Sequence, residues 1–485
     1  MSAQSPRVTV VGVVTHDREA SLVACLASYL ASCRRYARTP EFVVADDSAR
    51  QESRARVRAA LGTLEPTNGR TIRYAGLTEK KRFAEALARE SSVPRDVVDF
   101  ALFGDERCRL STGANRNCLL LDTLDALVFS ADDDTLCRTA VAPDLQQPVL
   151  FQRSYDPTEF WFFSDRRDAL EAVPVVETDL LGRHEQFLGR TLAEIDGTEG
   201  LTGRVAITLP GLVGDSGMGS SRYFLTLSGP SRARLLESRA AYMSALRSRE
   251  VLRTVPQPTI AASAFCMTTF FGFDNQKLLP PFFPVERNSD GIFGLTVHRC
   301  VKGSHVAFLP WVLCHAPELR AFDGNEAWTE AEGVKIADIL MACILSHDTA
   351  GAHDGDAARL QRLGKYLRDL GSLTIEDFEA FVSTAQQLRN VAATTLLETR
   401  LREHGASPAF WADDVRRTID ALRQTVTRRD YLVPRDLRDG RDANSARRLA
   451  QELVLKFGAL LEAWPTLVEA ARRLHANDCR VSDPL

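Results

Sequence analysis

The sequence lacks the features that mark several common protein classes. None of its apolar runs is long enough to span a bilayer, and the beginning, MSAQSPRVTVVGVVTHDRE, has too short an apolar run for a signal peptide. The ten cysteines are scattered, with no CxxC pair and no Cys/His cluster at zinc-finger spacing. These absences argue against a membrane protein and a zinc finger, and they predict a cytoplasmic protein whose thiols are buried or incidental.

Motifs for several nucleotide-binding and hydrolytic chemistries are also missing. No GxGxxG follows the first predicted strand, which argues against a nicotinamide-binding domain. The stretch GDSGMGSS lacks the lysine of a phosphate-binding loop and is interpreted as a mobile, lid-like loop within residues 180–230. No GxSxG elbow occurs. A net charge of -4 gives no reason to expect nucleic acid as a partner.

What is present is the composition of a globular protein, with 45% hydrophobic and 26% charged residues. A chain of 485 residues is too long for one ordinary core, so more than one domain is expected. The first third alternates short β-rich runs, such as RVTVVGVV and EFVVADDS, with amphipathic helical patterns. This alternation predicts an α/β fold with a mostly parallel sheet flanked by helices.

The C-terminal third differs, because it is helical almost throughout from about residue 325. We therefore predict a boundary near 322, with an α/β domain over 1–322 and an all-α domain over 323–485. Within the first domain, residues 1–145 form a regular half and 146–322 a less regular one.

Polar clusters follow three of the predicted strands. They are Thr15–Arg18, Asp46–Asp47 and Asp132–Asp134. The carboxyl ends of parallel strands meet at one edge of a sheet, where ligands of such folds bind. The sequence therefore predicts that these clusters form one site.

The acidic run in DALVFSADDDTLCR has two interpretations. Asp132 and Asp134 at a strand end have the spacing to turn two carboxylates toward one cation, and Mg²⁺ or Mn²⁺ prefers such oxygen ligands. The alternative is a solvated acidic turn. The preceding apolar strand and the second acid pair favour the cation.

Four segments, THDR, VVADDS, TGANRN and FSADDD, occur in an order that resembles the GT-A fold of family 2 nucleotide-sugar glycosyltransferases. The resemblance covers about the first 140 residues. It implies a Rossmann-like GT-A domain whose first half binds the nucleotide sugar and whose second half binds the acceptor. His16-Asp17 departs from the aromatic and Asn that the family often has there.

The resemblance also implies roles for individual residues. Asp47, with Asp46, would accept a hydrogen bond from a pyrimidine base, which a carboxylate does well. Arg116 would lie over the diphosphate near a helix start, although a surface ion pair is the alternative. The full predicted nucleotide set is Thr15, Arg18, Asp46, Asp47, Arg116, Asn117 and Asp133.

A transferase of this kind also needs a base that deprotonates the acceptor, and its metal ion needs ligands besides the two aspartates. The family often has an acidic pair at a later helix start, where this chain reads Ser289-Asp290, so Asp290 is the predicted catalytic base and Glu286 the reserve. A helix N-cap is the alternative for Asp290. His315, after a later strand-like run, is a candidate third metal ligand or a core histidine. His298 and His305 have no such position.

Together these features predict a metal-dependent, inverting glycosyltransferase that uses Mn²⁺ or Mg²⁺ and a nucleotide sugar, with UDP-sugars favoured. The acceptor is a glycan, a peptide or a small natural product. The C-terminal helices would dock the acceptor or join two copies of the chain. The alternatives are a nucleotidyltransferase and a catalytically silent sugar-nucleotide binding or scaffold protein.

Overall fold

The structure is a computed structural model that describes residues 6–64, 72–198, 200–218, 221–318, 333–348, 354–425 and 432–485. The predicted domain boundary near 322 lies outside these ranges. No helix within them is long and apolar enough to cross a bilayer.

The first third of the chain builds a parallel sheet, as the sequence predicts. Strands β1 (Val8–Thr15), β2 (Glu41–Asp46), β3 (Arg73–Ala75) and β4 (Leu127–Asp132) run parallel in the order β3-β2-β1-β4. Every residue of β1 except Thr9 is buried, which suits a sequence, VTVVGVVT, that consists mainly of valine. The connecting helices are α1 (Glu19–Arg35), α2 (Gln51–Leu61), α3 (Leu77–Ser91), α4 (Arg95–Phe103) and α5 (Thr112–Asp122).

The remainder of the sheet is mixed, so the expectation of a mostly parallel sheet is correct only for its first part. The described residues place thirteen strands in one sheet. Strand β11 (Phe270–Asp274) pairs antiparallel with both β4 and β8 (Arg204–Asp215). Strand β12 (Ser304–His315) then runs parallel to β8 and antiparallel to β5 (Thr135–Val141). Thus β4, β8 and β12 all end at the same edge of the sheet.

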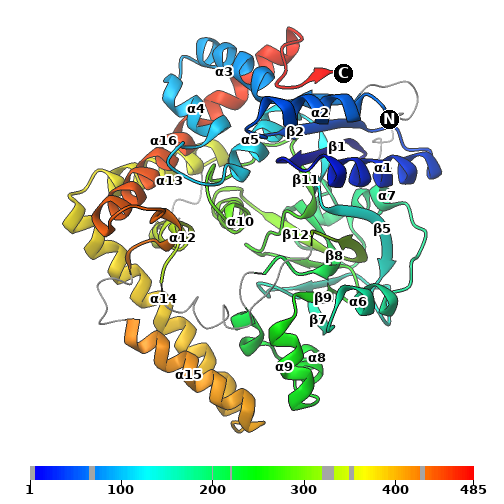
Figure 1. Ribbon diagram of the computed structural model, residues 1–485, viewed down its shortest axis with the longest axis vertical. Helices are drawn as coiled ribbons and strands as arrows, with labels where there is room; N and C mark the ends of the chain where they lie inside the picture. Colours follow the sequence, from blue (N-terminus) through cyan, green and yellow to red (C-terminus); the bar gives the residue numbers. More distant parts are fainter. Residues whose placement is uncertain are drawn as a thin grey trace.

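Shorter elements complete this part of the chain (Figure 1). They are β6 (Leu150–Gln152), β7 (Glu159–Phe162), β9 (Glu250–Thr254), β10 (Thr259–Ala261), α6 (Arg166–Ala172), α7 (Leu180–Glu185), α8 (Gly229–Leu235), α9 (Arg239–Arg247) and α10 (Ser289–Cys300).

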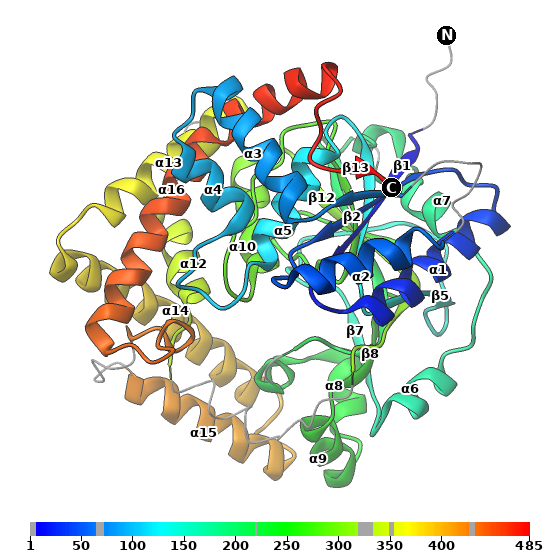
Figure 2. The same ribbon diagram turned by 45° about the horizontal axis from the view of Figure 1, so that its top comes forward.

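The C-terminal region is helical, as predicted. It contains α12 (Ile336–Ser346), α13 (Asp356–Gly371), α14 (Ile375–Glu403), α15 (Ala409–Thr425) and α16 (Ala443–Ala476). In both ribbon views these helices form a layer along one side of the molecule, with α16 beside α3 and α4 (Figures 1 and 2).

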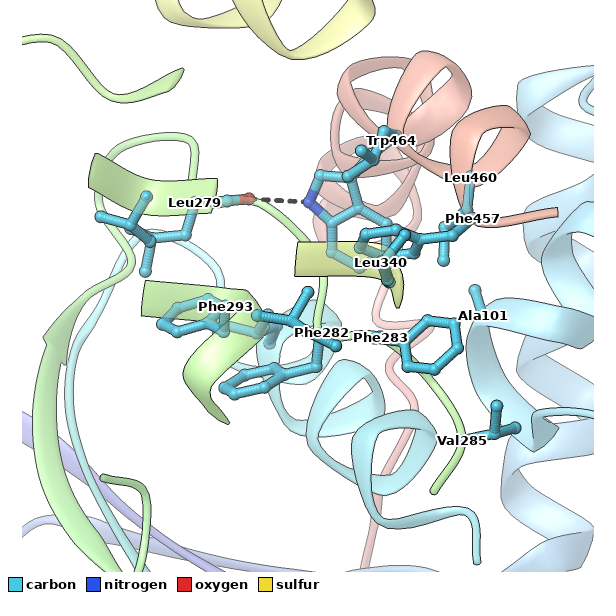
Figure 3. Close-up of a cluster of buried hydrophobic side chains, with 14 of the residues drawn as sticks. Ala101, Leu279, Phe282, Phe283, Val285, Phe293, Leu340, Phe457, Leu460 and Trp464 are labelled. Atoms are coloured by element: carbon cyan, nitrogen blue, oxygen red, sulfur yellow. Dashed lines mark hydrogen bonds between the residues drawn. The ribbon is translucent and has the colours of Figure 1, made fainter. Parts of the chain in front are cut away.

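Helices α12, α13 and α16 and the first part of α14 share one hydrophobic core with helices that cover the sheet, whereas α15 belongs to a second core that also contains α1. Trp464 of α16 is 1% exposed and donates from Nε1 to the carbonyl oxygen of Leu279 at 2.8 Å (Figure 3). Nearby, the ring of Phe457 meets Phe283 at 5.3 Å between centroids, and Phe282 stacks on Phe293 of α10 at 4.0 Å. The chain segment that leads into α10 is therefore fixed from the C-terminal side.

The chain end returns to the sheet, which the sequence pattern did not predict. Strand β13 (Asp483–Pro484) pairs antiparallel with β3. The preceding Ser482 donates from its backbone N–H and its Oγ to the two carboxylate oxygens of buried Asp122, at 2.8 and 2.7 Å. A buried carboxylate thus depends on a residue 360 positions away.

This contact yields a stability prediction. Ser482→Ala removes one hydrogen bond from a buried charge, so we expect the free energy of unfolding to fall by about 1–3 kcal/mol. Asp483→Asn is the control, since its partner Arg82 lies at the surface and the pair contributes at most about 1 kcal/mol. Urea unfolding measures both variants. If both variants lost the same free energy of unfolding, the hydrogen bonds from Ser482 to Asp122 would stabilise the fold no more than a surface ion pair does.

Candidate functional site

The three aspartates of the acidic run lie at the carboxyl end of β4, where Asp133 and Asp134 form the turn into β5. Thr15, the last residue of β1, donates from Oγ1 to Asp133 at 2.7 Å. Arg18 donates to Asp133 at 3.2 Å and to Asp134 at 2.6 Å. The structure therefore brings the Thr15–Arg18 cluster onto the acidic run, and the Asp47 N–H donates to the Thr15 carbonyl oxygen at 3.2 Å, so the third cluster adjoins them.

His315 joins this group through the pairing of β12 with β5. His315 lies opposite Thr135, so its Nε2 comes within 3.4 Å of Asp134 Oδ1. Its Nδ1 lies 2.5 Å from the carbonyl oxygen of Asp215, which can only accept, so Nδ1 carries a proton. Gly214 has a φ of +112° and a Cβ there would collide with the His315 carbonyl oxygen, so this approach requires glycine.

Arg116 links Asp132 to the predicted base. Its guanidinium donates to Asp132 at 2.6 Å, and its side chain is 5% exposed. Asp290 lies in the first turn of α10, where burial raises its pKa and the nearby charge of Arg116 opposes that rise. The charge of Arg116 therefore acts on both Asp132 and Asp290, and because Arg116 is buried the surface ion pair considered for it is excluded.

Close packing at the start of α5 positions Arg116. A Cβ at position 113 would collide with the carbonyl oxygen of Phe283, and the Ala114 N–H donates to the Pro284 carbonyl at 2.9 Å. The glycine of TGANRN thus allows α5 to contact the segment that leads into α10.

In the third predicted cluster, Asp46 and Asp47 have different environments. Asp47 lies at the rim and accepts from Ser111 Oγ at 2.6 Å and from His16 Nδ1 at 2.9 Å. Burial would raise the Asp47 pKa, but the His16 hydrogen bond and nearby Lys80 lower it. The same bond raises the pKa of His16 to about 9. Asp47 is therefore an anion beside a cationic histidine.

Two predicted nucleotide ligands, Asp46 and Asn117, are internal. Asp46 is 0% exposed and accepts from the Ser48 N–H at 2.8 Å and the Tyr74 hydroxyl at 2.7 Å. Asn117, also 0% exposed, bonds the backbone of Ala101 and Phe282 with its amide nitrogen and oxygen. Both side chains are occupied in fixing the scaffold, so the structure does not bring them to the site.

The reserve candidates also lie away from the acidic turn. Glu286 is buried and accepts from the Arg109 N–H at 2.8 Å. His305 lies at the opposite end of β12 from His315, and His298 lies on the exposed side of α10.

Sequence reasoning missed a buried cation. Lys80 of α3 is 2% exposed and donates from Nζ to the Asp46 carbonyl at 2.9 Å and to Asn115 Oδ1 at 2.7 Å. Its positions relative to Phe83, Ala84 and Leu87 are those of one helical face, which was the available signal.

Crowding of the carboxylates perturbs their pKa values. Burial, together with the neighbouring aspartates, raises the pKa of Asp132 to about 7 and that of Asp133 to about 6. Burial acts in the same direction on Asp134, but His315 and Arg18 outweigh it and lower that pKa to about 2. The turn thus holds one firmly ionised carboxylate and two whose ionisation is disfavoured by their surroundings, which a further cation would ease.

The donor set fits a hard divalent cation. Asp134 Oδ1 is buried and makes no hydrogen bond, and His315 is held as metal-binding histidines usually are, with its other nitrogen donating to a carbonyl. In the described ranges, however, no three His, Cys, Asp or Glu side chains already converge in a metal-site arrangement. Arg18 and Arg116 instead hold the carboxylates.

The predicted lid over 180–230 is wrong at its centre. Residues Arg204–Asp215 form β8, a buried strand within the sheet, because LPGLVGD continues an apolar run. The glycines there serve strand packing, and residues 219–220 of the Gly/Ser stretch lie outside the described ranges.

Comparison with known proteins adds no family assignment. No protein-family model matches the chain, and neither does any curated protein sequence.

The pKa values give a pH prediction for the protein in the presence of a chelator. Since the Asp133 pKa rises from 3.8 to about 6 on folding, its contribution is present at low pH and is lost as pH rises through 6. Two pKa units correspond to about 3 kcal/mol. As the pH rises from about 4 to 7, we expect the free energy of unfolding of Asp133→Asn to fall less than that of wild type, because the variant has no carboxylate to ionise at this position. Urea unfolding at several pH values measures this difference. An equal pH dependence of the unfolding free energy in both proteins would contradict the raised pKa of Asp133.

Proposed function

We propose that the protein is a metal-dependent glycosyltransferase of the GT-A type that transfers a sugar from a nucleoside diphosphate, with UDP-sugars as favoured donors. The observation that carries the proposal is the contact of His315 Nε2 with Asp134 Oδ1 at 3.4 Å, at the sheet edge where Asp132 ends β4, together with the absence of a hydrogen bond to that buried oxygen. The parallel order β3-β2-β1-β4, with polar clusters at the strand ends, supports a nucleotide site at that edge.

Asp132, Asp134 and His315 would hold Mn²⁺ or Mg²⁺. When bound, the cation would neutralise charge that develops on the leaving diphosphate. Arg18 and Arg116, which now pair with the carboxylates, would be free to contact phosphate oxygens. Asp47, ionised and partly exposed, would accept the imide N–H of a uracil base.

The proposed transfer is a single displacement. The acceptor oxygen forms a bond to the anomeric carbon while the bond from that carbon to the diphosphate oxygen breaks. The electron pair leaves with the nucleoside diphosphate, and the acceptor proton moves to the carboxylate of Asp290. Inversion at the anomeric carbon follows from the family resemblance. The raised pKa of Asp290 suits a group that must accept a proton.

Two other functions are less well supported. A nucleotidyltransferase needs a basic, glycine-rich loop for a triphosphate, whereas the segment after β1 reads THDR. A silent binding protein would need no base, yet Asp290 is a buried carboxylate on which the charge of Arg116, the partner of Asp132, acts. Measured turnover separates an enzyme from a binding protein.

Calorimetric titration of UDP and GDP, with and without Mn²⁺, tests the donor site. We expect wild type to bind UDP at least about tenfold more tightly with Mn²⁺ than without it, a difference of about 1.4 kcal/mol. Asp134→Asn should lose this gain, and Asp144→Asn, an exposed carboxylate further along the chain, should keep it. UDP binding that ignores both Mn²⁺ and Asp134 would overturn the proposal.

Asp290→Asn tests the base. Release of UDP from UDP-sugars to water should slow by roughly 100-fold or more, since general-base catalysis contributes about 10²–10⁴-fold. The affinity for UDP should not change, because Asp290 does not contact the nucleotide in the proposed arrangement. Unaltered release, with water as the acceptor, would exclude Asp290 as the base.

A further inference from the structure

A cavity of about 580 Å³ lies next to Asp290 and is not used by the donor site. Gly291, the residue that follows the proposed base in α10, lines it. The other walls come from Tyr155, from α10, and from α12 and α13 of the C-terminal region. Its size is within the range of small-molecule sites.

Part of the cavity wall is apolar and accessible. Leu295 and Met341 lie in the wall, and Tyr155 is 57% exposed at its edge. An exposed tyrosine beside apolar side chains offers a surface for an aromatic or aliphatic body. A purely polar ligand would leave this surface unused.

The charged part of the wall has one sign. Among the described residues that line the cavity there are two arginines, Arg299 and Arg359, and no Asp or Glu. Arg299 donates to the Leu345 carbonyl at 2.6 Å, whereas Arg359 Nε is buried without a hydrogen-bond partner. Within the described residues neither arginine forms an ion pair, in contrast to Arg18 and Arg116. A buried, unsatisfied guanidinium atom is costly unless a ligand completes it.

We propose that this cavity binds the acceptor, and that the acceptor is a small molecule with an apolar body and an acidic group held by Arg299 and Arg359. Its identity as acceptor rests on the proposed function, while ligand binding by the cavity does not. The acid anchors the molecule, and a separate hydroxyl or other nucleophile would reach Asp290 past Gly291. This selects an acidic small molecule among the acceptor classes that the sequence left open.

Three matched probes test the chemistry by calorimetry: phenylbutanoate, phenylbutyl phosphate and the neutral phenylbutanol. We expect one or both acids to bind more tightly than the alcohol, and the preferred acid identifies the anchoring group. Arg359→Gln and Arg299→Gln should each weaken the acid about tenfold or more and leave the alcohol unchanged. His298→Gln, also in the wall, is the control and should have no effect. Met341→Trp, which fills the cavity, should weaken all three probes.

An alcohol that binds as tightly as both acids, or acid binding that survives both arginine substitutions, would overturn the proposal. UDP titration with Mn²⁺ separates this failure from that of the donor site, since the arginine variants should bind UDP as wild type does. Acid binding without any UDP binding would leave a ligand cavity but overturn the acceptor role.

The acceptor role has its own readout. A probe beside Gly291 should exclude water from Asp290, so saturating acid should slow UDP release from UDP-sugars. Release that continues at the same rate with the acid bound would place the ligand away from the reacting centre and overturn that role.

Discussion

Repulsion among three adjacent carboxylates is the constraint on which the rest of the site depends. Asp133 and Asp134 are buried and Asp132 is half-buried at the end of β4, where their mutual repulsion is less screened than in water. Arg18, Arg116 and His315 offset it from three different segments. The fold therefore assembles cations around an acidic turn, and the raised pKa values of Asp132 and Asp133 show that the compensation is incomplete for these two carboxylates.

The segments that carry Arg116 and Asp290 are packed against the C-terminal helices in one core. Phe283 touches Phe457 of α16 while its carbonyl oxygen contacts Gly113 at the start of α5. One loop thus fixes Arg116 on α5 and leads to Asp290 on α10. The C-terminal helices hold that loop from behind and supply walls of the cavity next to Asp290. The C-terminal helices therefore help to position the residues of the site.

Features that depend on neighbouring residues could be predicted from the sequence, and features that depend on distant pairing could not. The parallel strands and the grouping of Thr15, Arg18 and the aspartates follow from apolar runs that end in polar residues. The antiparallel β11 and the returning β13 leave no comparable local signal. Asp46 and Asn117 carry groups that could bind a nucleotide. In the fold, however, these groups form hydrogen bonds with Tyr74 and Phe282, which the sequence alone does not reveal. The glycines at 211 and 214 suggested a loop and instead allow strands to approach closely.

The central claim is that the acidic turn holds a divalent cation beside a nucleotide diphosphate. Anomalous diffraction at the manganese edge, from crystals grown with UDP and Mn²⁺, tests it most directly. The account predicts a peak about 2.0–2.3 Å from carboxylate oxygens of Asp132 or Asp134, with diphosphate oxygens on its other side. UDP bound at this edge with no peak, or a peak at another group of residues, would contradict it.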